Sequence, residues 1–333
     1  MKDLQKLNRY SSNMSQFAEA VMSEMCDGPA KGSRIIHVSN GSGLNFTITP
    51  DRGLDMVECW YKGTPVAFRS PVGYASPYRY EPEGIRWLRN WPAGLMTTAG
   101  LRSTGSPAGD FGLHGRIGNQ PAEDVAISRG VDADGNYRIT VSGTVREAMM
   151  FGEYLEMRRS ISVAHGVNEI TVQDFVTNRA ATDDVVQILY HCNFGYPLVS
   201  PSMRLVAAKH NIVARTDKAK ANMADWATFP EPIDGFEEEC FFHELPADAD
   251  GMAAMTIENP DVNIRLRISY DTAKLPRIVE WKNPLAGYYV LGLEPTNTWL
   301  TGHDAEVANG TAKKIASGET LEFGVKFHFS DLA

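Results

Sequence analysis

The sequence predicts an all-β protein built from large antiparallel sheets. Three segments alternate apolar and polar residues with a period of two, which is the pattern of half-buried strands: Tyr137–Val145, Ile264–Asp271 and Leu321–Phe329. Turn signals such as Asp132–Asn136 separate the runs, and the sequence lacks the regular succession of strands and helices that builds a parallel sheet. A doubly wound α/β fold is therefore not expected.

The strands are expected to form one β domain over residues 34–333, because no internal repeat and no Pro/Gly/Ser-rich linker divides the chain. A short, helical N-terminal extension over residues 1–33 precedes this domain. The spacing of apolar and small residues predicts a helix over Gln5–Met25, and the helix breaker Asp27–Pro29 is expected to end it.

The composition excludes several classes of protein. Of 333 residues, 43% are apolar, and 32 Lys and Arg stand against 41 Asp and Glu, which gives a formal net charge of −9. This acidic balance, without any Lys/Arg-rich run, argues against a nucleic-acid partner. The longest apolar stretches are far shorter than the roughly 18 residues of a membrane-spanning helix, so no membrane partner is expected.

The N-terminus and the cysteines predict a cytoplasmic location. The first residues lack the apolar core of a signal peptide. The four cysteines are widely spaced and form no C-x-x-C pair, which favours reduced thiols over a disulfide framework.

Several signatures of well-known enzyme classes are missing. The sequence has no phosphate-binding G-x-x-x-x-G-K-[ST] loop, no dinucleotide-binding G-x-G-x-x-G, no H-E-x-x-H and no G-x-S-x-G. His243 precedes a glutamate but lacks a second histidine at helical spacing, so no metal site is expected.

A candidate acid lies on the predicted strand over residues 185–194. Side chains alternate across a strand, so Val186, Ile188, Tyr190, Cys192 and Phe194 form an apolar face. His191 lies on the more polar opposite face, where an imidazole could meet a ligand. The alternative is a histidine that is merely hydrogen-bonded on a sheet face.

A candidate base lies on the predicted strand over residues 287–295. Gly292 lies two residues before Glu294 on the same face, which leaves open space beside the carboxylate. Pro295 is expected to end the strand at an edge or rim of the sheet. Glu294 lies among Tyr and Val, so desolvation could raise its pKa toward neutrality, as a general base requires. The alternative is an ordinary surface glutamate.

Two further segments could surround a ligand. In Phe111–Asn119, glycines on both sides of His114 allow close approach, and Arg116 offers a fork of donors. The long irregular stretch Ser70–Asp110 contains Trp87 and Trp91, whose faces could stack on a sugar ring. Three arginines would rim these aromatics: Arg79, Arg86 and Arg89. The alternative for this loop is that its aromatic side chains pack onto the sheet.

In their order and spacing, these motifs resemble the galactose mutarotase (aldose 1-epimerase) superfamily. The resemblance rests first on Gly112–Arg116, the strand that carries His191 and Asn193, and Gly292–Pro295. Four further segments resemble the bacterial aldose 1-epimerase-like branch of this superfamily: Pro50–Asp55, Gly94–Leu101, Asn193–Pro197 and Glu280–Lys282. The resemblance covers nearly the whole chain from about residue 30 onward.

The resemblance implies a β-supersandwich with a sugar site across one concave sheet face, and a reaction without metal or organic cofactor. It implies that Glu294 is the catalytic base, that His191 is the catalytic acid, and that His114 holds the sugar. Arg89 is one candidate for an arginine of the family, beside Arg52 and Arg69, and His243 lies near the place of a sugar-binding aspartate. Arg116 or Lys282 could meet an acid group on the sugar. The predicted substrate-binding residues are Arg89, His114, Arg116, Asn193, His243 and Lys282.

The function expected from these observations is that of an aldose 1-epimerase, which interconverts the α and β anomers of a monosaccharide or derivative. Two alternatives remain open at this level: a non-catalytic sugar-binding or sensor protein, and another sugar isomerase or lyase on the same fold. The expected partner is a small-molecule sugar, and the expected state is a monomer or homodimer.

Overall fold

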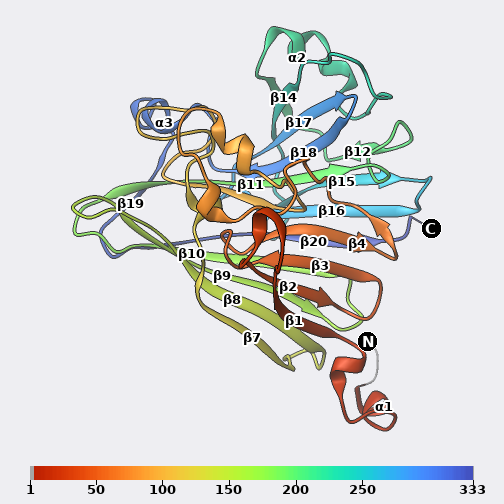
Figure 1. Cartoon of the computed structure of the whole chain (residues 1–333). Helices are drawn as coiled ribbons and strands as arrows, with labels where there is room; N and C mark the ends of the chain where they lie inside the picture. Colours follow the sequence, from red (N-terminus) through yellow and green to blue (C-terminus); the bar gives the residue numbers. More distant parts are fainter. Residues whose placement is uncertain (1–3, 333) are drawn as a thin grey trace.

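Strands dominate the computed structural model, which describes residues 4–332 (Figure 1). They form three sheets, and the paired strands within each sheet are antiparallel. The predicted all-β class with large antiparallel sheets is confirmed.

The largest sheet has eight strands, and it contains the three segments with the clearest alternation. Tyr137–Val145 lies in β8, Ile264–Asp271 forms β16 and Leu321–Phe329 lies in β20. Their apolar residues are buried in the main core and their polar residues are more exposed. In spatial order the strands are β12 (Arg204–Val206), β15 (Met252–Asn259), β16 (Ile264–Asp271), β20 (Thr320–Ser330), β10 (Glu169–Asn178), β9 (Tyr154–Ala164), β8 (Tyr137–Ala148) and β7 (Glu123–Val131).

A second sheet of seven strands carries the two predicted strands with candidate catalytic residues. In spatial order these are β13 (Asn211–Ala214), β14 (Glu239–Glu244), β17 (Arg277–Leu285), β18 (Tyr288–Thr296), β11 (Asp184–Gly195) and β19 (Lys313–Ile315), with β6 (Thr97–Leu101) also paired to β11.

The expectation that Pro295 ends its strand at an edge is wrong. The strand continues to Thr296 and lies inside the sheet, between β17 and β11. Pro295 has no N–H to donate, and the ladder to β11 is interrupted between Leu293 and Thr296.

The third sheet has five strands and includes part of the N-terminal segment. In order these are β1 (Glu19–Glu24), β2 (Arg34–Ser39), β3 (Leu44–Thr49), β4 (Asp55–Tyr61) and β5 (Thr64–Pro65). The predicted helix over Gln5–Met25 is therefore wrong for most of its length, since α1 (Leu4–Asn8) ends early and β1 pairs with β2. Asp27–Pro29 lies in the connection between these strands, so pairing to a neighbouring strand overrides the local helical spacing.

Helices are few and short. Besides α1, the α-helices are α2 (Asp217–Ala221) and α3 (His303–Ala308). Short 3₁₀ helices lie at η1 (Met14–Gln16), η2 (Gly28–Ala30), η3 (Pro77–Arg79), η4 (Arg86–Asn90), η5 (Ile117–Asn119) and η6 (Met223–Asp225). In Figure 1, α2 lies beyond β14 at one end of the molecule and α1 lies at the other.

The long stretch Ser70–Asp110 is mostly irregular, as predicted, but it also contains strand β6 over Thr97–Leu101. All five residues of β6 are buried. A strand that is buried on both faces shows no alternation, which explains why its sequence gave no strand signal.

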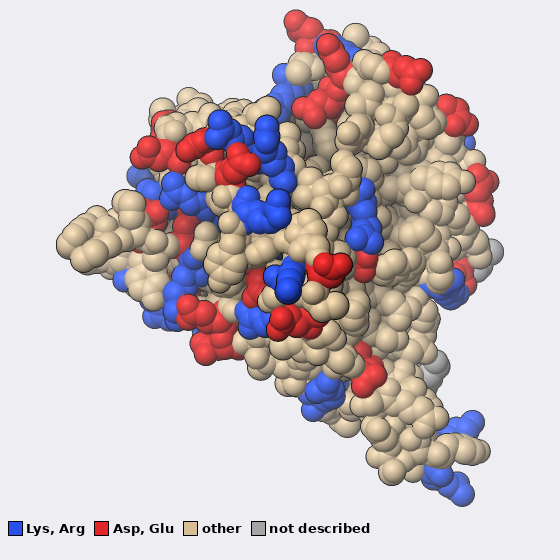
Figure 2. Space-filling view, viewed as in Figure 1, with Lys and Arg blue, Asp and Glu red and all other residues tan. Residues whose placement is uncertain are grey.

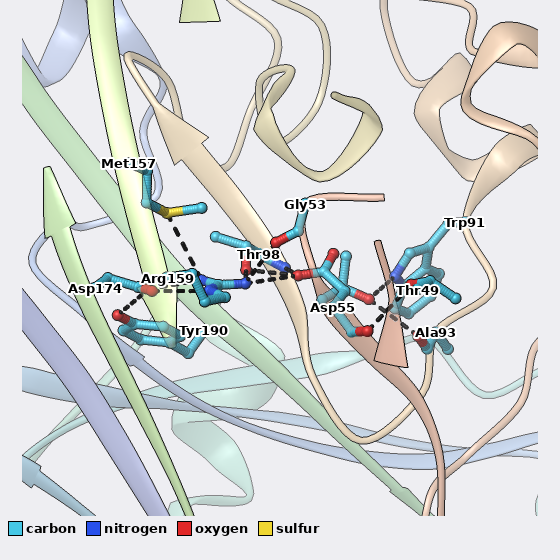
Figure 3. Close-up of polar contacts among 11 residues, drawn as sticks. Thr49, Gly53, Asp55, Trp91, Ala93, Thr98, Met157, Arg159, Asp174 and Tyr190 are labelled. Atoms are coloured by element: carbon cyan, nitrogen blue, oxygen red, sulfur yellow. Dashed lines mark hydrogen bonds and ion pairs between the residues drawn. The ribbon is translucent and has the colours of Figure 1, made fainter. Parts of the chain in front are cut away.

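A buried polar network ties the three sheets together. Arg159 of β9 donates to both carboxylate oxygens of Asp174 on β10, at 2.8 and 2.6 Å, and to Asp55 of β4 at 3.1 Å (Figure 3). It also donates to Thr98 of β6, while the Tyr190 hydroxyl of β11 donates to Asp174. The network thus joins strands of all three sheets, β11 among them.

The surface view shows no continuous basic stripe. On the face drawn in Figure 2, Lys and Arg side chains are interspersed with Asp and Glu. Within residues 4–332, no helix combines the length and the apolar character needed to cross a membrane.

Candidate functional site

A cavity of about 330 Å³ lies over one face of the seven-stranded sheet. Its volume is within the range of small-ligand sites. His191, Glu294 and Val279 lie in one row across β11, β18 and β17 and form part of its floor. Loop residues from the Ser70–Asp110 stretch form part of its wall, among them Trp87 and Trp91.

The two predicted catalytic residues lie side by side in this cavity. The register that pairs Cys192 with Leu293 places His191 directly opposite Glu294. His191 Nδ1 lies 3.2 Å from Glu294 Oε1, and the two side chains are only 6% and 2% exposed. Neither atom makes a well-directed hydrogen bond in the structure. Two buried polar groups without such bonds are the exception in folded proteins and are typical of a functional site.

Burial sets the protonation of this pair. Desolvation raises the pKa of Glu294 well above its usual range, the Glu238 charge raises it further, and the Arg215 charge opposes the rise. Desolvation lowers the pKa of His191 well below its usual range, and His114 acts in the same direction. A catalytic acid must hold a proton, so the role that the resemblance gives to His191 implies a protonated ring beside a charged Glu294. The directions of both pKa shifts favour a neutral pair instead, with the proton on the carboxyl group.

His114 lies in the same cavity as a neutral hydrogen-bond donor. Its backbone has a φ of 61°, an uncommon value for a residue with a side chain, and its ring centroid lies 5.3 Å from that of His191. The Gly105 N–H donates to His114 Nδ1 at 3.3 Å. Burial lowers the pKa of His114 to about 3, so the ring is neutral at pH 7 and its proton lies on Nε2.

The aromatic loop both lines the cavity and packs on the sheet. Trp87 and Trp91 stack on each other at 5.1 Å between ring centroids, and Trp91 lies 5.1 Å from the His191 ring. The Trp91 indole N–H donates to Thr97 of β6 at 3.2 Å, which fixes the ring over the site.

Three residues of the cavity escaped the sequence analysis as ligand contacts. Arg215 follows β13, Glu238 precedes β14, and Trp281 lies on β17. Trp281 donates through its indole N–H to Glu238 at 2.7 Å. The segment Glu280–Lys282 was one of the family-like motifs, but nothing in the sequence around Arg215 or Glu238 distinguished them from surface charges.

Two predicted substrate-binding residues point away from the cavity. Trp281 and Cys240 line it, so alternation turns Lys282 and His243 to the opposite face of the sheet. There Lys282 Nζ donates to the Asp225 carbonyl oxygen at 2.7 Å, and His243 lies between Glu280 and His210. We therefore leave both residues out of the site.

Three others lie outside the cavity or are engaged by the protein itself. Arg89 is exposed on η4 and does not line the cavity. Arg116 donates to the Asp110 carbonyl oxygen and lies 3.8 Å from Glu153. Asn193 faces the same side as His191, but its amide donates to the backbone oxygens of Gly94 and His191.

The donor set gives no support for a metal centre. Across residues 4–332, no group of three or more His, Cys, Asp or Glu side chains is arranged to hold an ion. The expectation of a reaction without metal or organic cofactor stays a prediction.

Solved structures of known fold match this architecture over most of its length. A protein from Klebsiella pneumoniae that has been proposed to be an aldose 1-epimerase is 25% identical, with a TM-score of 0.87 over 94% of this chain and 88% of that one. A galactose mutarotase-like protein from Clostridium acetobutylicum is 14% identical (TM-score 0.62, 95% and 100% covered). The galactose 1-epimerase from Lactobacillus acidophilus is 11% identical (TM-score 0.59, 94% and 99% covered).

The protein therefore has the galactose mutarotase-like fold, as the sequence motifs predicted. Within that class, the chain belongs to the family described as a domain of unknown function, DUF4432, whose model matches residues 30–329. No curated protein matches the chain.

Proposed function

We propose that this protein is an aldose 1-epimerase, which interconverts the α and β anomers of a monosaccharide or sugar derivative. The observation that carries the proposal is the pair His191–Glu294, which lies buried and in contact at the floor of a ligand-sized cavity. Mutarotation needs one group that accepts a proton and one that donates a proton at the anomeric centre, and this pair has both capacities.

The neutral pair that burial favours holds the same number of protons as the pair of ions. Moving one proton from Glu294 Oε1 to His191 Nδ1, across the 3.2 Å contact, gives a carboxylate and an imidazolium. The active form of the pair is therefore the form with one shared proton, wherever that proton resides before substrate binds.

In the proposed mechanism, the Glu294 carboxylate takes the proton of the anomeric hydroxyl while the imidazolium of His191 donates one to the ring oxygen. The bond between the anomeric carbon and the ring oxygen breaks, and the product is the open-chain aldehyde with a new hydroxyl group. Rotation about the adjacent carbon–carbon bond turns the other aldehyde face toward that hydroxyl. The proton transfers then run in reverse and close the ring.

The rest of the cavity is suited to holding a sugar. The Nε2–H of neutral His114 can donate to a hydroxyl group, since Nδ1 already accepts from Gly105. Trp281, which is partly exposed, offers an aromatic face on which the C–H bonds of a sugar ring can stack, and the buried, mutually stacked Trp87 and Trp91 line the cavity.

The four free cysteines fit the further proposal of a reducing, cytoplasmic location.

The first test replaces each member of the pair. Glu294→Gln and His191→Asn should each lower the rate of anomer exchange by about 10²- to 10⁴-fold while sugar binding remains measurable. The double variant should be little slower than either single one, because the two groups act as a unit. Saturation-transfer NMR on a panel of aldoses measures the exchange, and circular dichroism checks the fold of each variant.

The same NMR experiment separates the alternatives. Binding without exchange by the wild-type protein would mean a sugar sensor, and signals of a new product would mean another isomerase or a lyase. Near wild-type exchange by either folded variant would remove that residue from the mechanism. The wild-type rate should show a bell-shaped dependence on pH, because only the singly protonated pair is active.

A further inference from the structure

Arg215 lines the cavity that contains the catalytic pair, and its positive charge has no ion-pair partner within residues 4–332. Its backbone N–H donates to the Cys240 carbonyl oxygen at 3.0 Å, which extends the pairing of β13 with β14 by one residue. Cys240 lies opposite Trp281, and Trp281 lies opposite Gly292, so Arg215 stands at the end of a row that crosses the sheet to β18. The small residues Cys240 and Gly292 leave space along this row.

The guanidinium of Arg215 has little to bind in the protein. The exposed guanidinium donates from Nη2 to the Ser106 hydroxyl at 3.2 Å and also interacts with the Cys240 side chain, but no carboxylate within residues 4–332 forms an ion pair with it. Two other arginines of the molecule differ in this respect. Arg102 pairs with Glu153 and Asp184, and Arg116 lies within ion-pair distance of Glu153.

Glu238 does not neutralise Arg215 by direct contact. Its carboxylate lines the same cavity but accepts the indole N–H of Trp281 at 2.7 Å. The charge of Arg215 nevertheless acts across the cavity, since it opposes the rise in the pKa of Glu294 and adds to the fall in the pKa of His114. Because Arg215, His191 and Glu294 line one cavity, a negatively charged group of a ligand can reach Arg215 while the anomeric carbon lies at the pair.

We infer that the sugar bound here carries a carboxylate at the end distant from its anomeric carbon, and that Arg215 binds this carboxylate. This inference rests on the proposed function for the position of the anomeric carbon. A guanidinium presents two parallel N–H groups that match the two oxygens of a carboxylate. A sugar phosphate fits less well, because its second negative charge would face Glu238, with Arg215 as the one Lys or Arg among the described residues that line the cavity.

The experiment compares sugar acids with neutral sugars of the same ring configuration. The probes are D-glucuronate and D-galacturonate beside D-glucose and D-galactose, with D-glucose 6-phosphate as a third arm. Saturation-transfer NMR gives kcat/KM for anomer exchange, and tryptophan fluorescence gives binding. The variants are Arg215→Gln and Arg215→Lys, with Arg204→Gln on the edge strand β12, outside the cavity, as the matched control.

For the preferred hexuronate, Arg215→Gln should lower kcat/KM by about 10- to 100-fold, mainly through KM, because it removes a hydrogen-bonded charge from the bound state. For the neutral hexose the loss should be about threefold or less, because that sugar makes no charged contact. Arg215→Lys should give an intermediate kcat/KM for the hexuronate, because lysine keeps the positive charge but lacks the two parallel N–H groups. Arg204→Gln should match the wild type.

Equal losses for hexuronate and hexose in Arg215→Gln would overturn the inference, as would faster exchange of the sugar phosphate than of either hexuronate. Both results would leave the proposed epimerase function standing. Conversely, hexuronate binding that depends on Arg215 but shows no anomer exchange would support carboxylate recognition and overturn the epimerase function.

Discussion

The contact between His191 and Glu294 depends on the small size of one neighbouring residue. A Cβ atom added at Gly292 would lie 2.4 Å from Glu294 Oε1 and 3.0 Å from the Cβ of Trp281. The backbone at Gly292 is extended, so the requirement for glycine is steric and concerns the carboxylate itself. The space that the sequence predicted at Gly292 is therefore taken by the carboxylate itself.

Gly292→Ala should therefore displace the Glu294 carboxylate and reduce anomer exchange without unfolding the protein. We expect a loss of about 10²-fold, which is the effect of a misplacement near 1 Å at a reacting centre. Gly130→Ala on β7 is the control, because a Cβ there would meet no atom within 4 Å. Exchange kinetics and thermal unfolding of both variants make the comparison. Wild-type kinetics in Gly292→Ala would show that the carboxylate position does not limit the reaction.

At the scale of the strands, β8 carries a buried carboxyl group, that of Glu147, which does not line the cavity. Glu147, near the end of β8, is 3% exposed and accepts the backbone N–H of Leu101 in β6 at 2.7 Å. It thus links the eight-stranded sheet to the strand beside β11. Burial raises the pKa of Glu147 to about 7, although the Leu101 N–H and the nearby Arg116 charge oppose the rise.

This raised pKa makes the free energy of unfolding depend on pH in a defined direction. The unfolded chain releases the Glu147 proton near pH 4.5, whereas the folded protein keeps it to about pH 7. Between these values the native state binds more protons, so the stability that this group contributes is complete below pH 4.5 and is lost as the pH rises to 7.

Glu147→Gln should flatten that part of the stability profile, because the amide does not titrate. The difference in slope between wild type and variant should integrate to on the order of 3 kcal/mol over this window. Urea unfolding at several pH values measures it, with the exposed Glu231→Gln as the control. Parallel profiles for the wild type and Glu147→Gln would mean that the carboxyl titrates as it does in the unfolded chain.

At the scale of the whole molecule, Arg159 is the side chain that holds the three sheets in one arrangement (Figure 3). The residue is fully buried, and its ion pairs reach Asp174 at 2.6 Å and Asp55 at 3.1 Å. A buried ion pair adds little net stability over an apolar replacement of both partners, but removal of one partner leaves the other charge buried and unpaired.

Arg159→Met should consequently lower the free energy of unfolding by about 3–5 kcal/mol, whereas Arg158→Met, the exposed neighbour, should cost less than about 1 kcal/mol. The loss should shrink at acid pH. Burial already raises the pKa of Asp55 to about 6, and the carboxyl group can take a proton once the arginine is gone. Denaturant unfolding at pH 7 and at pH 5 tests both expectations. An equal loss at the two pH values would show that lost packing, rather than an unpaired charge, causes the effect.

The local pattern of the sequence determined which residues could do the chemistry. Alternation over residues 185–194 and 287–295 placed His191 and Glu294 on the correct faces of their strands, because side-chain direction along a strand depends only on parity. The motifs around them also indicated the fold, which the structural comparisons confirm.

Only the tertiary structure decided how these residues meet. The register between β11 and β18 brings His191 opposite Glu294, and strand pairing across about a hundred residues leaves no mark in either segment. Other strand pairings had equally distant consequences. The pairing of β13, β14 and β17 brings Arg215 and Glu238 to the cavity and turns His243 and Lys282 away from it, and pairing with β2 makes a strand of Glu19–Glu24, which alone resembled a helix. The pKa values also depend on the folded environment: burial lowers the pKa of His191, whereas its role as the catalytic acid implied a charged ring.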